Sequence, residues 1–356
     1  MVPLNGFASK EMLKRPHIIP TFTILSQVTG RIGIMCGHFF CINPRLILKL
    51  IIMKTIRVAG NFLLGSLCSL LLISEFAFKE KSVKGISNSN QWNAPDLPEQ
   101  ISFANEKVPV DRWDVREKFD KEFLQIYYSP GGILYLIKLA NRNFPFISER
   151  LKANGVPDDF KYLCIAESNM QSWAVSKSGA VGYWQFLHGT GAGYGLEISS
   201  QVDQRQHLEK ATDAACKYFK SAYAKFGNWT AAAASYNCGM GGYNSQATFQ
   251  RTTNYYDLQL PEETNKYIFR ILTYKYLLEN AEKLGFHVDE DKKYQKVETR
   301  SVTITSTIPD LAVFAINNGT TYKMLRVLNP WLKGKSLTAS NGRTYLINLP
   351  VEQESK

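Results

Sequence analysis

The spacing of apolar residues between positions 111 and 283 constrains the fold more than any other feature. Apolar and charged residues alternate there at the period of an α-helix. The segments with this period are 111–128, 133–153, 209–226, 230–236 and 262–283, and Pro130-Gly131-Gly132 is expected to break the first from the second. Alternation typical of strands appears only late, at 302–305 and 345–349. The sequence therefore predicts a mainly α domain followed by a small α+β module.

Two polar segments indicate where these parts begin and end. The chain has 356 residues, enough for about two domains. Residues 79–93 are rich in Ser and Asn, which predicts a tether, and residues 288–300 are charged, which predicts a linker. We therefore expect a helical domain over 94–287 and a module over 301–350.

The net charge of +11 is distributed unevenly along the chain. Residues 1–85 contain 11 Lys and Arg against 3 Asp and Glu, whereas the remainder contains 31 against 28. A protein that binds nucleic acid is expected to carry its basic residues on a folded domain. The basicity of this chain belongs mostly to its N-terminus, so it favours membrane targeting, and we expect no nucleic-acid partner.

Residues 53–78 resemble a secretory signal. Residues 53–57 are short and basic, and an uncharged, mostly apolar run extends from there to residue 74. This run is shorter than the roughly 20 residues of a membrane-spanning helix. We predict that 53–78 is a signal peptide or membrane anchor, that Met53 is the biological start, and that 1–52 is non-native upstream sequence.

The six cysteines do not indicate a disulfide framework. Cys36, Cys41 and Cys68 precede the expected mature protein, and the other three lie on or near predicted helices, where small apolar packing is expected. No cluster of His, Cys and Asp with ligand spacing accompanies the motifs described below. We therefore expect neither a metal nor a cofactor.

One carboxylate occupies a position where the helical pattern places an apolar residue. A helix is expected from Pro157, and Phe160, Leu163 and Cys164 form one apolar stripe along it. The next residue on that stripe is Glu167. A frayed helix end that lets the carboxylate reach water explains this locally, and the ten residues around Glu167 favour that explanation on their own. The alternative is a carboxyl group held away from water in a functional site.

Glycine-rich and alanine-rich motifs follow this helix. Residues 174–196 contain six glycines, which make a poor helix but a close-packed loop suited to a ligand. Tyr183, Trp184 and Gln185 supply the aromatic faces and the amide that sugar binding needs, although Trp184 is equally explained as core. Residues 228–242 then combine an alanine-rich helix with Tyr236, Asn237 and a second glycine turn.

Together and in this order, the motifs resemble those of the lytic murein transglycosylases with a goose-lysozyme-like catalytic domain. The matching residues are Glu167-Ser168, then Ser176, Gly179-Ala180, Gly182 and Gln185-Phe186, then Ser235-Tyr236-Asn237-Cys238-Gly239, then Glu263-Thr264 and Tyr267. The likeness covers residues 92–286. Ser235 stands in place of the usual Ala, Cys238 in place of a small residue, and Leu187 in place of a frequent Met.

The resemblance implies roles for these residues. Glu167 is implied as the catalytic acid, with a pKa raised by its position on the apolar stripe. Ser176, Gln185, Tyr236 and Asn237 are implied in substrate binding. The supporting residues implied are Ser168, Glu263 and Tyr267. A solvated carboxylate at a helix start explains Glu263 equally well.

The implied reaction cleaves the bond between N-acetylmuramic acid and N-acetylglucosamine in peptidoglycan and leaves 1,6-anhydromuramoyl ends. A hydrolase needs a second carboxylate, and none lies between Ser168 and Leu196. A hydrolytic muramidase and an inactive peptidoglycan-binding scaffold remain as alternatives. The implied location is the cell envelope, with export to the periplasm. Glycan strands and, if the N-terminal segment is uncleaved, the membrane are the expected partners, and protein partners are left unassigned.

The C-terminal module resembles a degenerate LysM domain. Residues 307–332 contain two short helical segments and a Leu-x-x-Leu-Asn-Pro turn, and residues 343–350 match a closing strand. The usual Gly-Asp-Thr-Leu turn is absent. We expect Leu311, Leu325 and Leu328 to pack in its core, and we expect the module to act through avidity for the cell wall and to leave the chemical step unchanged.

Overall fold

The computed structural model describes residues 93–339 and 342–351. The described residues all belong to one compact unit. The predicted upstream segment, signal and most of the tether lie outside the described residues. No helix in the described part of the chain is both long and apolar enough to cross a membrane.

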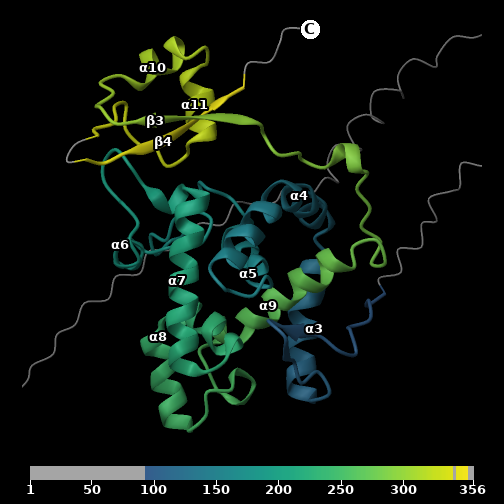
Figure 1. The fold of residues 1–356 in the computed structure, drawn as a ribbon. Helices are drawn as coiled ribbons and strands as arrows, with labels where there is room; N and C mark the ends of the chain where they lie inside the picture. The colour runs from purple at the N-terminus through teal and green to yellow at the C-terminus, as the bar shows by residue number, and fades with distance from the viewer. Residues whose placement is uncertain (1–92, 340–341, 352–356) are drawn as a thin grey trace, which may run out of the picture. The chain divides into compact units, whose positions relative to one another are not determined.

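The described chain begins as a helical domain (Figure 1). Its helices are α3 (Trp113–Tyr127), α4 (Pro130–Ala153), α5 (Phe160–Ser168), α6 (His188–Gly193), α7 (Leu208–Phe226), α8 (Trp229–Gln250) and α9 (Glu262–Glu279). Two short antiparallel strands, β1 (Ser102–Phe103) and β2 (Glu106–Lys107), precede them. The mainly α prediction is confirmed, but β1 and β2 were not expected, because two-residue strands carry no readable alternation.

Several helix ends differ from the sequence prediction for local reasons. Pro130-Gly131-Gly132 is the first turn of α4 and not a break, since proline is well suited to the first helical position. The helix carrying Glu167 begins at Phe160, three residues later than expected. Within the glycine-rich segment, His188–Gly193 forms the helix α6, where a loop was predicted.

Helix α8 continues beyond the predicted glycine turn. Gly239 has φ +76° and ψ +147°, which interrupts the helix with a kink, after which the chain remains helical to Gln250. Only glycine adopts this conformation without strain. The alanines at 231–234 before the kink are all fully buried, and α8 packs closely against α7.

Helix α5 lies at the centre of the domain, against α4 and α9. Phe160, Leu163 and Cys164 have no exposed surface, so the predicted apolar stripe is confirmed. Phe160 packs on Phe219 of α7, with ring centroids 4.3 Å apart. The stripe thus anchors α5 in the core and fixes the direction in which its last turn, with Glu167, projects.

The C-terminal module has the α+β structure predicted for it. Strand β3 (Thr299–Ile304) pairs antiparallel with β4 (Tyr345–Pro350), and α10 (Leu311–Asn317) and α11 (Tyr322–Leu328) lie between them in sequence. Leu311 and Leu325 are fully buried, whereas Leu328 is only half-buried. At the altered turn, the Asp310 carboxylate accepts hydrogen bonds from the backbone N–H groups of Ala312 and Val313 and caps α10.

The predicted linker packs against α4. The Asn141 Nδ2 donates to the Tyr294 carbonyl at 3.1 Å, and the Arg142 guanidinium lies 5.1 Å from the Tyr294 ring centroid. Strand β3 already begins at Thr299, inside the predicted linker. These contacts restrict residues 288–300 more than a polar composition alone would indicate.

Candidate active site

Glu167 lies in the last turn of α5. Helix α5 ends at Ser168 and is capped by Asn169, whose φ of +51° is left-handed, a conformation that Asn tolerates better than most residues. The Tyr267 hydroxyl of α9 donates a hydrogen bond to Glu167 Oε1. This is the one hydrogen bond to the carboxyl within the described chain, so the carboxyl group keeps acceptor capacity for a ligand.

A cleft of about 490 Å³ opens at Glu167. Its walls come from the end of α5, from the loop after it and from α9. The predicted site residues that line it are Glu167, Ser168, Ser176 and Gln185. Glu167 is the only carboxylate among the described residues that line this cleft. The arrangement offers one acid without a second carboxylate opposite it.

Burial raises the pKa of Glu167 to about 7. The hydrogen bond from Tyr267 and the positive charge of Arg270 act in the opposite direction, and the negative charge of Glu263 adds to the increase. The carboxyl group is therefore largely protonated below neutral pH and can donate a proton to a ligand in the cleft.

Residues 174–187, which precede α6 and are called the glycine loop below, are attached to α5 and α8 by side-chain hydroxyls. Ser168 Oγ donates to the Tyr183 carbonyl at 2.7 Å, and the Tyr236 hydroxyl donates to the Trp184 carbonyl at 2.7 Å. Gln185 Nε2 donates to the carbonyls of Ala174 and Gly182 at 3.0 and 2.9 Å. Ser168 and Tyr236 thus hold the loop in position, and Gln185 braces it from the cleft side.

The structure decides between the two explanations that the sequence left open for Trp184. Trp184 is fully buried, and its indole N–H donates to Thr212 Oγ1 at 2.9 Å, so it belongs to the core and presents no face to a sugar. The exposed indole nearby is Trp173, 66% exposed and adjacent in sequence to the cleft residue Ala174. Long-range packing decides which tryptophan is exposed, and the local sequence carries no signal for it.

Four of the predicted residues lie outside the cleft wall: Tyr236 and Tyr267, which act through the hydrogen bonds described above, and Asn237 and Glu263. Asn237 Oδ1 accepts a hydrogen bond from Thr264 Oγ1 at 2.8 Å, which connects α8 to α9. Glu263 is exposed in the first turn of α9 and pairs with Lys266 at 2.9 Å and Arg270 at 3.0 Å. Burial pushes the Glu263 pKa upward, but these two cations outweigh it and hold the pKa below its ordinary value. Glu263 therefore reaches the cleft only through Arg270.

Helix α9 contributes two cleft residues that the sequence analysis missed. Arg270 and Tyr274 line the cleft, and Tyr267 contacts the carboxyl group of Glu167. Positions 267, 270 and 274 are three and four residues apart, so they share one helix face. Because the sequence motifs already indicate Tyr267, this spacing is the signal that points to Arg270 and Tyr274.

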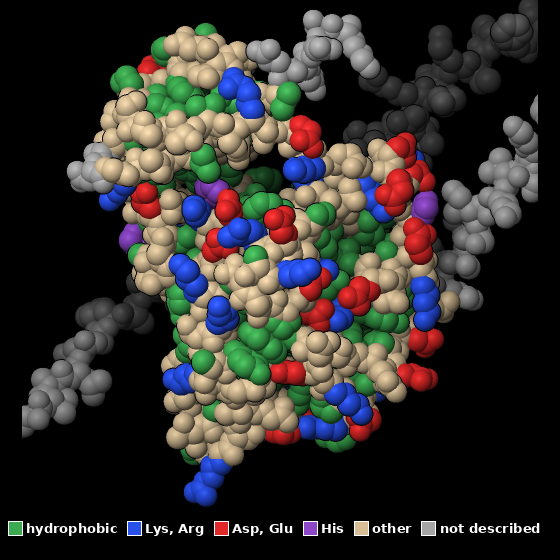
Figure 2. All heavy atoms as spheres, viewed as in Figure 1, with side chains coloured by type: hydrophobic (Ala, Val, Ile, Leu, Met, Phe, Trp, Pro, Cys, Tyr) green, Lys and Arg blue, Asp and Glu red, His purple; other side chains and the backbone are tan. Residues whose placement is uncertain are grey.

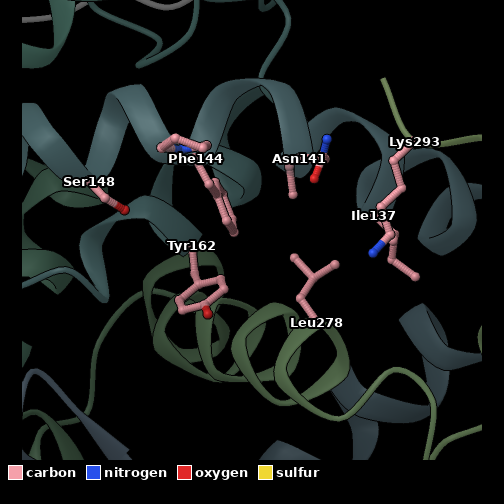
Figure 3. A pocket seen from close by; sticks show the side chains of 9 residues that line it. Ile137, Asn141, Phe144, Ser148, Tyr162, Leu278 and Lys293 are labelled. Carbon is pink, nitrogen blue, oxygen red and sulfur yellow. The ribbon is translucent and has the colours of Figure 1, made fainter. Parts of the chain in front are cut away.

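A second hollow, of about 340 Å³, lies between α4, α5 and α9 (Figure 3). Its lining includes the rings of Phe144 and Tyr162 and the side chain of Asn141. The Tyr162 hydroxyl donates to Glu279 at 3.1 Å, and Asn141 donates to the linker backbone, so these polar groups already have protein partners. No carboxylate is among its described lining residues. The cleft at Glu167 is the candidate active site.

Comparison with known families agrees with this geometry. Residues 144–258 match the family described as Transglycosylase SLT domain, and this stretch contains Glu167, the glycine loop and Tyr236. Residues 300–353 match the family described as Soluble lytic transglycosylase C-terminal LysM-like domain. The SLT match ends before α9, so Tyr267 and Arg270 lie outside it.

Two curated proteins are similar to part of this chain. Membrane-bound lytic murein transglycosylase D of Escherichia coli strain K12 is 27% identical over 236 residues, which cover 64% of this chain and 51% of that protein. The protein of the same name from Escherichia coli O6:H1 matches equally well. The chain therefore spans about half the length of these relatives.

A solved structure, that of an inactive mutant of lytic transglycosylase Slt from Pseudomonas aeruginosa, is also similar. It is 21% identical with a TM-score of 0.33, and the match covers 42% of this chain and 26% of that one.

Proposed function

We propose that this protein is a peptidoglycan lytic transglycosylase that cleaves the bond between N-acetylmuramic acid and N-acetylglucosamine. The observation that carries the proposal is the Glu167 carboxyl group, which has a pKa near 7 and is the single carboxylate among the described residues lining the cleft. The SLT domain and the curated relatives support the substrate class.

In the proposed reaction, Glu167 first acts as an acid. Its proton passes to the glycosidic oxygen as the bond from that oxygen to C1 of the muramic acid breaks. The ionised carboxylate then takes the proton of the 6-hydroxyl of the same sugar while that oxygen forms a bond to C1. Glu167 ends protonated, no water is consumed, and the product carries a 1,6-anhydro ring. The internal nucleophile gains from being held close to C1.

We assign supporting roles from the contacts around the cleft. Tyr267 orients Glu167 through its hydrogen bond, and Arg270, held by Glu263, contributes positive charge at the cleft. We propose that Gln185 and Ser176, which line the cleft, contact the sugars. Tyr236 acts through the loop, because its hydroxyl is bound to the Trp184 carbonyl.

Domain limits and location complete the proposal. We propose a catalytic domain over 94–287 and a LysM-like module from about residue 299, with export to the periplasm of a cell envelope and membrane attachment through residues 53–78. Basic and acidic side chains are interspersed on the face in Figure 2, which accords with a glycan substrate rather than a nucleic acid.

Mass spectrometry of digested sacculi tests the reaction. Anhydromuramoyl ends are expected from the purified protein. Reducing ends in their place would support the hydrolytic alternative, and the absence of any released fragment would support an inactive binding protein. The single carboxylate of the cleft favours the first outcome.

A further inference from the structure

The segment between α6 and α7 is part of the core of the C-terminal module. Val202 is 1% exposed and belongs to the buried cluster formed by the module, where it bridges to Leu332. The backbone N–H of Asp203 donates to the Trp331 carbonyl at 2.8 Å, and that of Lys333 donates to the Gln201 carbonyl at 2.7 Å. The module is therefore joined to the helical domain by apolar burial and by backbone pairing.

Side chains extend this contact. The Tyr345 hydroxyl donates to Glu197 Oε1 at 3.0 Å. Gln201 Nε2 donates to Ser336 Oγ at 2.9 Å, and Gln201 Oε1 accepts from the Thr338 backbone N–H at 3.0 Å. Such a contact, with satisfied hydrogen bonds around an apolar centre, is typical of a specific interface and unlike that of a freely tethered module.

The other side of the same segment holds the glycine loop through Arg205. Arg205 is 7% exposed, and its guanidinium pairs with Asp203 at 2.7 Å. The same guanidinium donates to the carbonyls of Phe186 and Gly179 at 3.1 and 3.3 Å. One planar cation thus connects the segment to the loop on both sides of Gln185, at Gly179 and at Phe186.

Backbone packing confirms how close the loop lies to this segment. A Cβ atom at Gly182 would lie 2.0 Å from the Arg205 carbonyl oxygen, a distance that only glycine permits. Gly182 accepts the hydrogen bond of Gln185 Nε2, and Gln185 lines the cleft. A continuous series of buried contacts therefore runs from the module through Arg205 to the cleft wall.

We propose that Arg205 is a positioning residue for the cleft and that the LysM-like module braces the loop through the segment carrying Val202 and Arg205. The part of this inference that concerns rate depends on the proposed transglycosylase function. It replaces the expectation that the module acts only through avidity, because a module that shares a buried residue with the catalytic domain also affects the order of the loop.

Two substitutions in the full chain test separately the contact of Arg205 with the loop and the contact of Val202 with the module. Arg205→Lys keeps the charge but loses the planar group that reaches three acceptors. Its matched control is Arg300→Lys, at an exposed position of β3. Val202→Asp places a charge in the module core and is expected to release the module. Its control is Leu346→Asp, at a position of β4 that is 57% exposed.

Hydrogen exchange of residues 174–187, measured without substrate, is the first readout. Faster exchange there is expected for Arg205→Lys and Val202→Asp, and unchanged exchange for both controls. The second readout is turnover of a short soluble glycan, well below the melting temperature. There kcat is expected to fall about tenfold or more, because misplaced contact groups slow the reaction. A purely structural role would lower the melting temperature and leave kcat unchanged.

The outcomes are distinct. Unchanged exchange at 174–187 in Arg205→Lys, or unchanged exchange and kcat in Val202→Asp while β3 and β4 exchange faster, would overturn the brace. If Val202→Asp does not fold, Gln201→Ala, which removes two hydrogen bonds to the module, takes its place. If the wild-type protein forms no anhydromuramoyl ends, the proposed function fails, while the exchange measurements still decide on the brace.

Discussion

Glu167 is a carboxylate at a position where the local helical pattern places an apolar residue. It continues the stripe of Phe160, Leu163 and Cys164, where an apolar residue would pack without cost. In the structure it lines a cleft, where burial favours the neutral acid. The explanation by a frayed, solvated helix end does not fit a carboxyl group that accepts a hydrogen bond from Tyr267 on a helix capped by Asn169.

Glu167→Gln is expected to retain substrate binding and to lose at least about a hundredfold in kcat, because an amide cannot donate the proton. Its stability is also informative. The folded protein holds a proton that the unfolded chain releases between pH 4.5 and about 7, so burial of Glu167 destabilises the wild type as the pH rises through that window. The free energy of unfolding of the variant, relative to that of the wild type, should therefore increase by on the order of 3 kcal/mol between pH 4 and pH 8. Urea unfolding at the two pH values measures this difference in stability. Turnover of the variant within about tenfold of wild type would contradict the role of Glu167 as the acid.

Tyr267→Phe is expected to shift the pH profile. The Tyr267 hydrogen bond favours the ionised carboxylate, so its loss should raise the pKa of Glu167 further. In the wild type, kcat/KM should decline as the pH rises through about 7, and in the variant this decline should move to higher pH. A profile of kcat/KM from pH 5 to 9 is the measurement. A shift to lower pH would show that the hydroxyl acts on Glu167 in another way.

Trp173→Ala is expected to weaken glycan binding. The indole is 66% exposed, Trp173 directly precedes the cleft residue Ala174 in the chain, and an exposed aromatic face suits a sugar ring. KM should rise several-fold, while the free energy of unfolding changes by less than about 0.5 kcal/mol, as for most surface substitutions. Trp113→Ala, at a position of α3 that is 74% exposed, is the control. Equal effects of the two changes on KM would exclude a specific contact.

At the scale of elements, the glycine loop and its neighbours form one wall of the site. Ser168 of α5, Tyr236 of α8 and Arg205 each bind a backbone carbonyl of this loop. Gln185 itself has φ +48°, a left-handed conformation that is costly for a residue with a long side chain. The hydrogen bonds of its amide to Ala174 and Gly182 offset that cost.

Gly182→Ala and Gly179→Ala form a matched pair that measures how tightly this loop is packed. Both glycines have left-handed φ, +83° and +79°, so both changes incur the same backbone strain of about 1–2 kcal/mol. Only at Gly182 would the new methyl group meet the Arg205 carbonyl, since nothing lies within 4 Å at Gly179. Gly182→Ala should therefore lower the free energy of unfolding by about 1–3 kcal/mol more. Equal losses in urea unfolding would show that the loop moves away freely.

At the scale of the whole described chain, the helical domain and the module share Val202 in one buried cluster. Trp331 also stacks on His207 at the start of α7, with ring centroids 5.6 Å apart, and burial lowers the His207 pKa to about 4. The imidazole is therefore neutral near pH 7 and adds no charge to the contact.

Residues 93–351 are accordingly expected to unfold in a single thermal transition. Units that share buried apolar surface and hydrogen bonds lose both when either unfolds, so their unfolding is coupled. Calorimetry should give equal calorimetric and van't Hoff enthalpies, and Val202→Asp should separate the transition into two. Two transitions in the wild-type protein would show that the module folds independently.

Features of the fold that depend on residues close together in the chain could be predicted from the sequence. Helical periods located most of α3, α4, α7 and α9, alternation located β3 and β4, and ordered motifs located Glu167, Ser176 and Gln185 in the cleft. These patterns are readable because side chains three or four apart on a helix, or two apart on a strand, share a face.

Features that depend on contacts between residues far apart in the chain became visible only in the folded structure. Tyr267 reaches Glu167 across 100 positions, Trp184 is buried while Trp173 is exposed, and Val202 enters the core of the module. No local period encodes which distant element covers a side chain or which carbonyl its hydroxyl meets. The raised pKa of Glu167 belongs to this second group, because burial by the assembled fold, and not the helix that carries the residue, removes the carboxyl group from water.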